Sequence, residues 1–166
     1  MKNSFRAAIF FFALLLMPAA YATDNPRIDL VVVEKSARKM MLISKGDTVR
    51  TYEIALGDMP VGHKQREGDE RTPEGRYVLD WRNPNSAFHL SIHISYPDAD
   101  DRAEAAAAGY SPGGDIMIHG QPNGFGWWSW LLQMIDWTDG CIAVTNADMD
   151  EIWEMVDNGT PIEIRP

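Results

Sequence analysis

The sequence of 166 residues has almost no cysteine, since Cys141 is the only one. A single thiol cannot form a disulfide within the chain, which excludes a scaffold held together by disulfides. Cys141 is therefore free, paired with another molecule or chemically employed. Basic residues are also in deficit, because 24 Asp and Glu against 15 Lys and Arg leave a formal charge of −9. This charge argues against a nucleic-acid partner and against binding to anionic lipid by charge.

The sequence also lacks a long apolar run. The apolar stretch from Ala7 to Met17 is much shorter than the roughly 20 residues that span a bilayer. It follows two basic residues and precedes the small-x-small motif Ala20-Tyr21-Ala22, which predicts a cleaved signal peptide over residues 1–22. The alternative is an uncleaved N-terminal anchor. After cleavage we expect one domain over residues 23–166, exported and not membrane-spanning.

The hydrophobic pattern predicts a mainly β fold. Short β-branched or alternating runs indicate strands over residues 28–33, 39–43, 48–56, 77–79, 88–95, 115–119 and 161–164. Helices are expected at the alanine-rich residues 102–108, near 127–137, and near 147–156 with Asn146 as N-cap. The three aspartates of residues 97–101 are interpreted as a solvated turn, because they lack the spacing of a calcium loop.

The strand predicted over residues 88–95 alternates strictly between polar and apolar residues. His89, Ser91, His93 and Ser95 then share one face. We expect this face to adjoin the strand that ends at His119, so that Ser91 and His93 line a pocket with Tyr96 at the same edge. Solvated or structural histidines are the alternative. A zinc site is not expected, because no third ligand is evident near the two histidines.

The chemistry of the chain centres on His119-Gly120 and on the later stretch Thr138-Asp139-Gly140-Cys141. A thiol becomes a nucleophile when an imidazole accepts its proton and backbone N–H groups stabilise the oxyanion that forms. These residues favour a Cys/His pair for acyl transfer. The alternative is that Cys141 is a small buried side chain and His119 is unrelated to it.

These two stretches, extended to Ile118 and Ile142, resemble the signature of the L,D-transpeptidase (YkuD-type) family. The stretch from Arg71 to Tyr77 is similar to the Thr-Pro-x-Gly turn and strand of that family, and the resemblance covers residues 28–166. It implies a β-sandwich-like catalytic domain that acts on peptidoglycan in the periplasm, without a cofactor or a metal. The predicted signal peptide is consistent with this location.

The resemblance also implies roles for individual residues. Cys141 would attack a stem-peptide carbonyl and form a thioacyl-enzyme, with His119 as general base and acid. The backbone carbonyl of Gly120 would orient the imidazole. Backbone N–H groups at Gly140 and Cys141 would form the oxyanion hole, where glycine leaves room for the substrate. Substrate contacts are expected from five residues: His93, Ser91, Thr138, Asp139 and Tyr96.

Two positions depart from the family pattern. Asp139 replaces a common histidine, and Ala143 replaces a common arginine two residues after the cysteine. Asp139 is interpreted as a turn residue or as a partner for a basic group of the substrate. The stretch from Gly140 to Asn146 resembles a branch in which some members hydrolyse bonds to peptidoglycan. The alternatives to crosslinking or remodelling by transfer are therefore a hydrolase (L,D-carboxypeptidase, endopeptidase or amidase) and an inactive wall-binding module.

Four tryptophans lie between the two halves of the motif, at positions 127, 128, 130 and 137. Their density predicts core or lid scaffolding, and stacking on sugar rings is the alternative.

Overall fold

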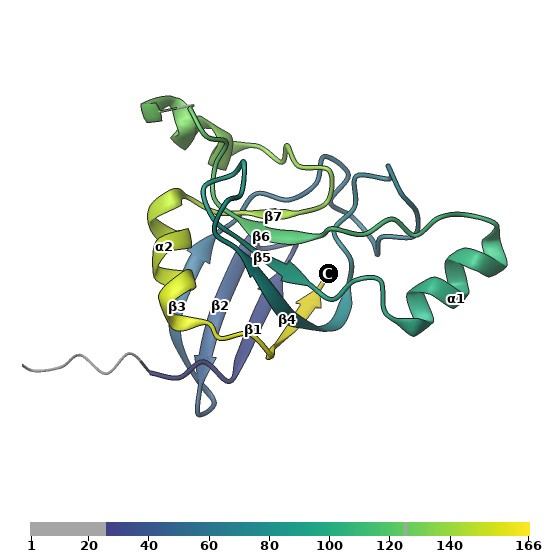
Figure 1. Cartoon of the computed structure of the whole chain (residues 1–166), viewed down its shortest axis with the longest axis horizontal. Helices are drawn as coiled ribbons and strands as arrows, with labels where there is room; N and C mark the ends of the chain where they lie inside the picture. Colours follow the sequence, from purple (N-terminus) through teal and green to yellow (C-terminus); the bar gives the residue numbers. More distant parts are fainter. Residues whose placement is uncertain (1–25, 125) are drawn as a thin grey trace, which may run out of the picture.

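The computed structural model describes residues 26–124 and 126–166 (Figure 1). The predicted signal peptide lies outside the described residues. The strands are β1 Leu30–Glu34, β2 Lys39–Ser44, β3 Asp47–Glu53, β4 Gly75–Asn83, β5 Ser91–Ile94, β6 Met117–His119, β7 Ile142–Ala143 and β8 Thr160–Arg165. The helices are α1 Ala99–Ala108, α2 Asn146–Met155 and the 3-10 helix η1 Gly126–Met134. The mainly β fold with a few short helices is thus confirmed.

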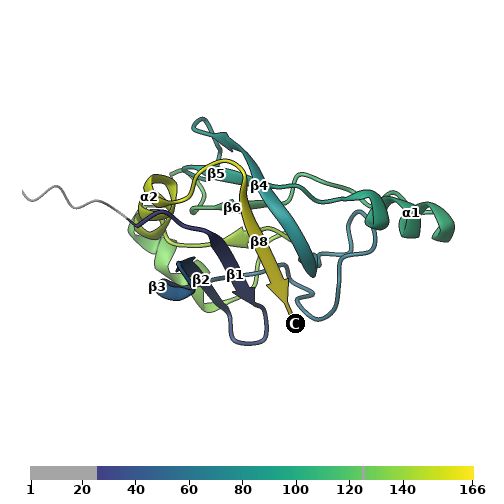
Figure 2. The same ribbon diagram turned by 90° about the horizontal axis from the view of Figure 1, so that it is seen from below.

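All eight strands belong to one sheet, in the order β3-β2-β1-β8-β4-β5-β6-β7. The C-terminal strand β8 lies between β1, to which it is parallel, and β4, to which it is antiparallel (Figure 2). The β-meander of the first three strands is therefore joined through β8 to the strands that carry the candidate site.

The sheet curls until its two edges meet. Ala55, just after β3, exchanges two backbone hydrogen bonds with Ala143 of β7, at 2.9 and 2.8 Å. Gly57 forms a further bridge with Thr138. Because the segment after the first edge strand pairs with the last one, the backbone groups of both edges are satisfied at this point.

The core lies inside this curl and under α2. Its fully buried members include Val31, Leu42, Ile118 and Ile162 from four strands. Helix α2 lies beside β3 (Figure 1) and contributes Met149, Ile152 and Met155 to the core. None of the helices in the described ranges is long and apolar enough to cross a membrane.

Strand β5 begins at Ser91, so the expected strand over residues 88–95 is too long at its start. His89 has a φ of 66°, in the left-handed region, and this interrupts the extended backbone on which the alternation depends. The His89 ring nitrogen Nε2 lies 2.6 Å from a carboxylate oxygen of Asp150 in α2. His89 therefore does not share a strand face with His93.

Both α-helices begin one or more residues away from the expected positions. Asp98 caps α1 and forms a capping box with Asp101, so the acidic residues interpreted as a turn start the helix. Thr145, one residue before the expected Asn146, caps α2 and accepts the Asp148 N–H at 3.1 Å. The apolar segment expected as a helix near 127–137 forms the 3-10 helix η1, which ends at Met134.

Candidate active site

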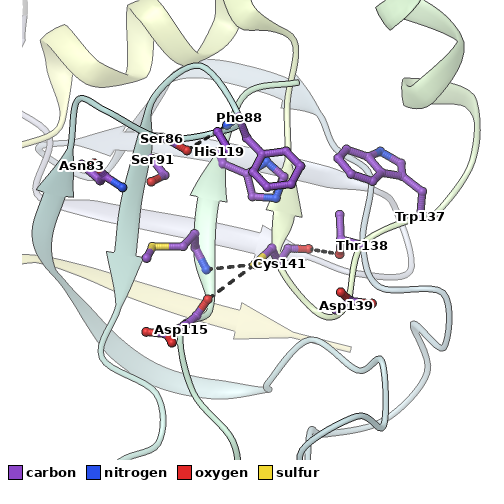
Figure 3. Close-up of a pocket in the computed structure, with 12 residues that line it drawn as sticks. Asn83, Ser86, Phe88, Ser91, Asp115, His119, Trp137, Thr138, Asp139 and Cys141 are labelled. Carbon is purple, nitrogen blue, oxygen red and sulfur yellow. Dashed lines mark hydrogen bonds between the residues drawn. The ribbon is translucent and has the colours of Figure 1, made fainter. Parts of the chain in front are cut away.

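A cavity of about 330 Å³ opens at the ends of β5, β6 and β7 (Figure 3). Cys141, His119, Thr138, Asp139 and Ser91 all line it. The other lining residues are Asn83, Ser86, Ala87, Phe88, Asp115, Met117 and Trp137. The cavity therefore brings together both halves of the sequence motif, which are separated by η1 in the chain.

Cys141 directly precedes β7, and its thiol is held by the backbone before and within β6. The Met117 N–H donates to Sγ at 3.4 Å, and the thiol donates to the carbonyl oxygen of Asp115 at 3.7 Å (Figure 3). Burial raises the pKa of the thiol above its ordinary value of 9.0. The charges of Asp139 and Asp115 raise this pKa further, whereas the Met117 N–H and Lys64 lower it. The thiol is therefore protonated at neutral pH.

His119 ends β6 and is 4% exposed. Its Nδ1 lies 2.6 Å from the carbonyl oxygen of Gly120. A carbonyl oxygen can only accept, so Nδ1 carries the proton and Nε2 of the neutral ring is left as an acceptor. The ring packs against Phe88 and Trp137, at centroid distances of 4.7 and 5.7 Å. Burial lowers the pKa of His119, and the bond to Gly120 opposes this only in part.

His119 and Cys141 face the same cavity, but no hydrogen bond joins them in the described structure. Burial favours the neutral form of each, so the resting pair is a thiol and an imidazole rather than an ion pair.

The turn that presents Cys141 is closed by Thr138. The Gly140 N–H donates to Thr138 Oγ1 at 3.2 Å, and that hydroxyl donates to the carbonyl oxygen of Cys141 at 2.7 Å. The Gly140 N–H, for which we expected a role in an oxyanion hole, is thus engaged within the turn.

Gly140 is required for packing within the protein rather than for the approach of substrate. Its φ is 117°, and a Cβ at this position would lie 2.5 Å from the carbonyl oxygen of Arg71. Gly57 is under the same restriction, because a Cβ added there would lie 2.0 Å from the carbonyl oxygen of Glu70. The space that we expected for substrate is thus filled by the loop before the Thr72-Pro73-Glu74-Gly75 turn.

Lys35, directly after β1, holds that turn in place. Its ammonium donates to the carbonyl oxygens of Gly62 and Thr72 at 2.7 and 2.8 Å and to Glu74 at 2.9 Å. The side chain is only 2% exposed. Burial lowers the pKa of Lys35, and the Glu74 carboxylate opposes this. The Thr72–Gly75 turn is therefore held firmly next to the loop on which the turn of Cys141 packs.

Two of the expected substrate-binding residues do not line the cavity. His93 lies two residues, about 7 Å, further along β5 than Ser91. Its Nδ1 lies 2.7 Å from Asp80, and its ring stacks on Trp81 at 5.0 Å. Tyr96 is 2% exposed, and its hydroxyl donates to the carbonyl oxygen of Pro112 at 3.0 Å.

Several lining residues were not anticipated from the sequence. Met117 lies two residues before His119 on β6, so strand alternation could have placed it on the same face. Asp115 lies two residues before that strand begins. No sequence pattern could have placed Phe88 at the cavity, because the β4–β5 connection reaches the cavity only in the folded protein.

Two tryptophans of η1 lie at the surface. Trp128 and Trp130 are 53% and 54% exposed, so the expectation that they form core is wrong for these two, and the lid alternative stays a prediction. Trp137 lines the cavity beside His119. The side chain of Trp127 lies outside the described residues.

Within residues 26–124 and 126–166, no three His, Cys, Asp or Glu side chains converge where a metal ion would fit. A neutral thiol and a neutral, hydrogen-bonded imidazole in one cavity suit nucleophilic acyl chemistry.

The curled sheet and the Cys141–His119 cavity define the class of protein. Residues 28–164 match the YkuD family, the L,D-transpeptidase catalytic domain, and the chain belongs to that family. Members of the family are L,D-transpeptidases, which act on peptidoglycan.

Among curated proteins, the chain is similar to YafK of Escherichia coli strain K12, whose assignment as an L,D-transpeptidase is provisional. The two are 36% identical over 109 residues, which cover 64% of this chain and 36% of YafK. The chain therefore spans about a third of the length of that relative.

Two solved structures show the same fold. The helical cell shape determining protein Pgp2 of Campylobacter jejuni aligns with a TM-score of 0.64 at 23% identity, over 84% of this chain and 48% of Pgp2. An L,D-transpeptidase of Mycobacterium smegmatis aligns with a TM-score of 0.54 at 14% identity, over 82% of this chain and 58% of its own.

Proposed function

We propose that the protein is a cysteine-dependent acyltransferase that acts on peptidoglycan stem peptides, in cell-wall crosslinking or remodelling. One observation carries the proposal: Cys141 and a tautomer-fixed His119 face one cavity. Export to the periplasm through residues 1–22 is part of the proposal and would place the enzyme beside its substrate.

In the first half-reaction, the substrate carbonyl enters the cavity next to Cys141. His119 Nε2 accepts the thiol proton as Sγ attacks the carbonyl carbon, and the Cys141 N–H donates to the oxyanion. The carbon–nitrogen bond then breaks, and the imidazolium returns the proton to the leaving amine. The product is a thioester on Cys141, and Gly120 keeps the imidazole oriented throughout.

In the second half-reaction, an acceptor attacks the thioester while His119 removes its proton. An amine acceptor gives a new peptide bond, and water gives a free acid. Hydrolysis is the second candidate function, because Ala143 is fully buried and places no guanidinium near the site.

The test is incubation of the purified protein with intact sacculi, followed by mass spectrometry of every released or newly joined muropeptide. We expect turnover by the wild type and by His93→Ala, a control outside the cavity. Turnover should be lost in Cys141→Ala and in His119→Ala.

The products separate the candidates. Crosslinked dimers or exchanged amino acids indicate transfer, and free acids indicate hydrolysis. Full activity in Cys141→Ala would contradict both. Binding to sacculi without any turnover would contradict both enzymatic functions and support an inactive wall-binding module.

A further inference from the structure

A second cavity, of about 390 Å³, lies at the connection between β3 and β4 and has no lining residue in common with the cavity of Cys141. Arg66 and Arg71 both line it. Neither guanidinium forms an ion pair or a hydrogen bond within the part of the chain that the structure describes. The other lining residues are Met59, Gln65, Gly68, Asp69, Glu70 and Tyr110. In a chain with a formal charge of −9, two arginines without an acidic partner are unexpected.

Asp69 lines the same cavity, but its carboxylate is already engaged. The ammonium of Lys64, whose side chain is 3% exposed, donates to it at 2.9 Å. The backbone N–H groups of Gln65, Arg66 and Arg71 donate to it at 2.8, 3.0 and 3.2 Å. Burial acts to raise the pKa of Asp69, but these donors outweigh it and lower the pKa below the ordinary value of 3.8. Asp69 is thus an ionised anchor for the loop, paired with Lys64 rather than with the two arginines.

The same loop sets the positions of the two guanidinium groups. Both arginine backbones bind one carboxylate, and the Arg66 guanidinium carbon lies 5.4 Å from the centroid of the Tyr110 ring, in a cation–π contact. Arg71 is half-buried, so its charge has lost part of its hydration. Glu70 is the one lining carboxylate that no described residue engages. The cavity therefore keeps an excess of positive charge that an oxyanion can neutralise.

The second cavity adjoins the turn that presents Cys141. The Arg71 carbonyl oxygen lies against Gly140, where an added Cβ would come within 2.5 Å of it. The N–H of Asp58, one residue before the cavity lining, donates to the Thr138 carbonyl oxygen at 3.1 Å. A residue of the second cavity thus packs directly against the nucleophile turn.

We propose that this cavity, the arginine pocket, is a second substrate-binding site that holds a free carboxylate of the peptidoglycan polymer, outside the linkage that reacts at Cys141. A guanidinium group presents a fork of N–H donors that matches the two oxygens of a carboxylate. Arg66 and Arg71 supply two such forks and the positive charge. The proposal rests on the proposed function, which makes a wall peptide the substrate.

A second point of attachment raises the local concentration of the polymer at Cys141 without contact to the reacting atoms. Arg66 and Arg71 are therefore binding residues and not catalytic residues. Their removal is expected to weaken substrate binding and to leave the chemical step unchanged.

The first test measures binding without turnover, in the Cys141→Ala protein. The probe is a synthetic stem peptide with free carboxylates, and the control ligand is the same peptide with every carboxylate amidated. Titration is followed by NMR through the Nε–Hε signals of Arg66 and Arg71 and the backbone amide of Gly68. We expect these signals to shift with the free-acid peptide and not with the amidated one.

The Kd read from the Gly68 amide should rise by about tenfold in Arg66→Gln and in Arg71→Gln, because each removes charge-assisted hydrogen bonds. Arg50→Gln is the matched control. Arg50 lies on β3 and pairs with Glu151 of α2, on the opposite side of the molecule from α1 (Figure 1). Its loss removes the same charge and should leave the Kd unchanged. Signals elsewhere in the spectrum report whether each variant is folded.

Equal Kd values for the free-acid and amidated peptides, or an unchanged Kd in both arginine variants, would overturn the proposal. Tighter binding of inorganic phosphate than of the free-acid peptide would also overturn it, because the pocket would then take a phosphate.

A second arm uses turnover of a muropeptide. The double variant Arg66→Gln/Arg71→Gln should raise KM by at least about tenfold and leave kcat unchanged. A loss of kcat at unchanged KM would contradict a binding role. Absent turnover by the wild type contradicts the proposed function instead, and the NMR titration then decides the carboxylate site alone.

Discussion

At the scale of single residues, the site combines a protonated thiol with a neutral imidazole. His119 is buried and Cys141 is partly buried, and this burial moves the pKa of each in the direction that removes its charge. The Gly120 carbonyl fixes the tautomer of His119, so the lone pair that accepts a proton is already in place. Activation of Cys141 is therefore coupled to attack rather than completed beforehand.

The pH dependence of alkylation by the neutral reagent iodoacetamide follows from these shifts. Raising the pH deprotonates the thiol, and because its pKa lies above 9.0, the rate should still be rising at pH 9. The increase should be about tenfold per pH unit below that pKa. His119 stays neutral down to pH values below its ordinary pKa of 6.5, so its protonation adds no step near neutrality.

The control is the urea-unfolded protein, in which the midpoint should return to the ordinary thiol pKa of 9.0. A rate that is already at its plateau at pH 7 would show a preformed thiolate–imidazolium pair and contradict the neutral pair.

At the scale of elements, the site depends on one turn packed against another. The Thr138–Cys141 turn lies against the backbone of Arg71, and Lys35 holds the following turn in place. Neither contact involves the cavity. The Thr72–Gly75 motif therefore has a structural role, because it supports the turn that presents Cys141.

Gly140→Ala tests this packing, with Gly159→Ala as the matched control. Both glycines have φ in the left-handed region, at 117° and 91°, but only Gly140 has a backbone atom in the way of a Cβ. Gly159→Ala should lower the free energy of unfolding by about 1 kcal/mol, and Gly140→Ala by at least about 3 kcal/mol. Urea unfolding measures both, and equal losses would contradict the packing account.

Local patterns predicted most elements but not their bounds. The β-branched runs correctly predicted the strands of the meander and β8, because apolar β-branched residues favour buried strands. The alternation around His89 misled, since His89 Nε2 pairs with Asp150 across the fold and its φ is positive. The apolar segment after Gly126 forms a 3-10 helix in which Trp128 and Trp130 are exposed. No local sequence pattern distinguishes such a segment from a buried helix.

At the scale of the whole molecule, curling of the sheet assembles the candidate site. Pairing of Ala55 with Ala143 joins the two edges and holds β7 beside β6, so that Cys141 and His119 reach one cavity. Sequence reasoning named Cys141, His119 and Gly120 from the motif. Phe88 was missed because it approaches the cavity only when the β4–β5 connection folds over the site. Asn83 was missed because it reaches the cavity through the pairing of β4 with β5, where it lies opposite Ser91.

The most direct test of the central claim is detection of the thioester on Cys141. The protein is mixed with a purified stem-peptide muropeptide, quenched in acid within the first turnover and analysed by intact and peptide mass spectrometry. We expect an acyl adduct on the peptide that contains Cys141 in the wild type and none in Cys141→Ala. Turnover by the wild type without any adduct, together with turnover by Cys141→Ala, would contradict the account.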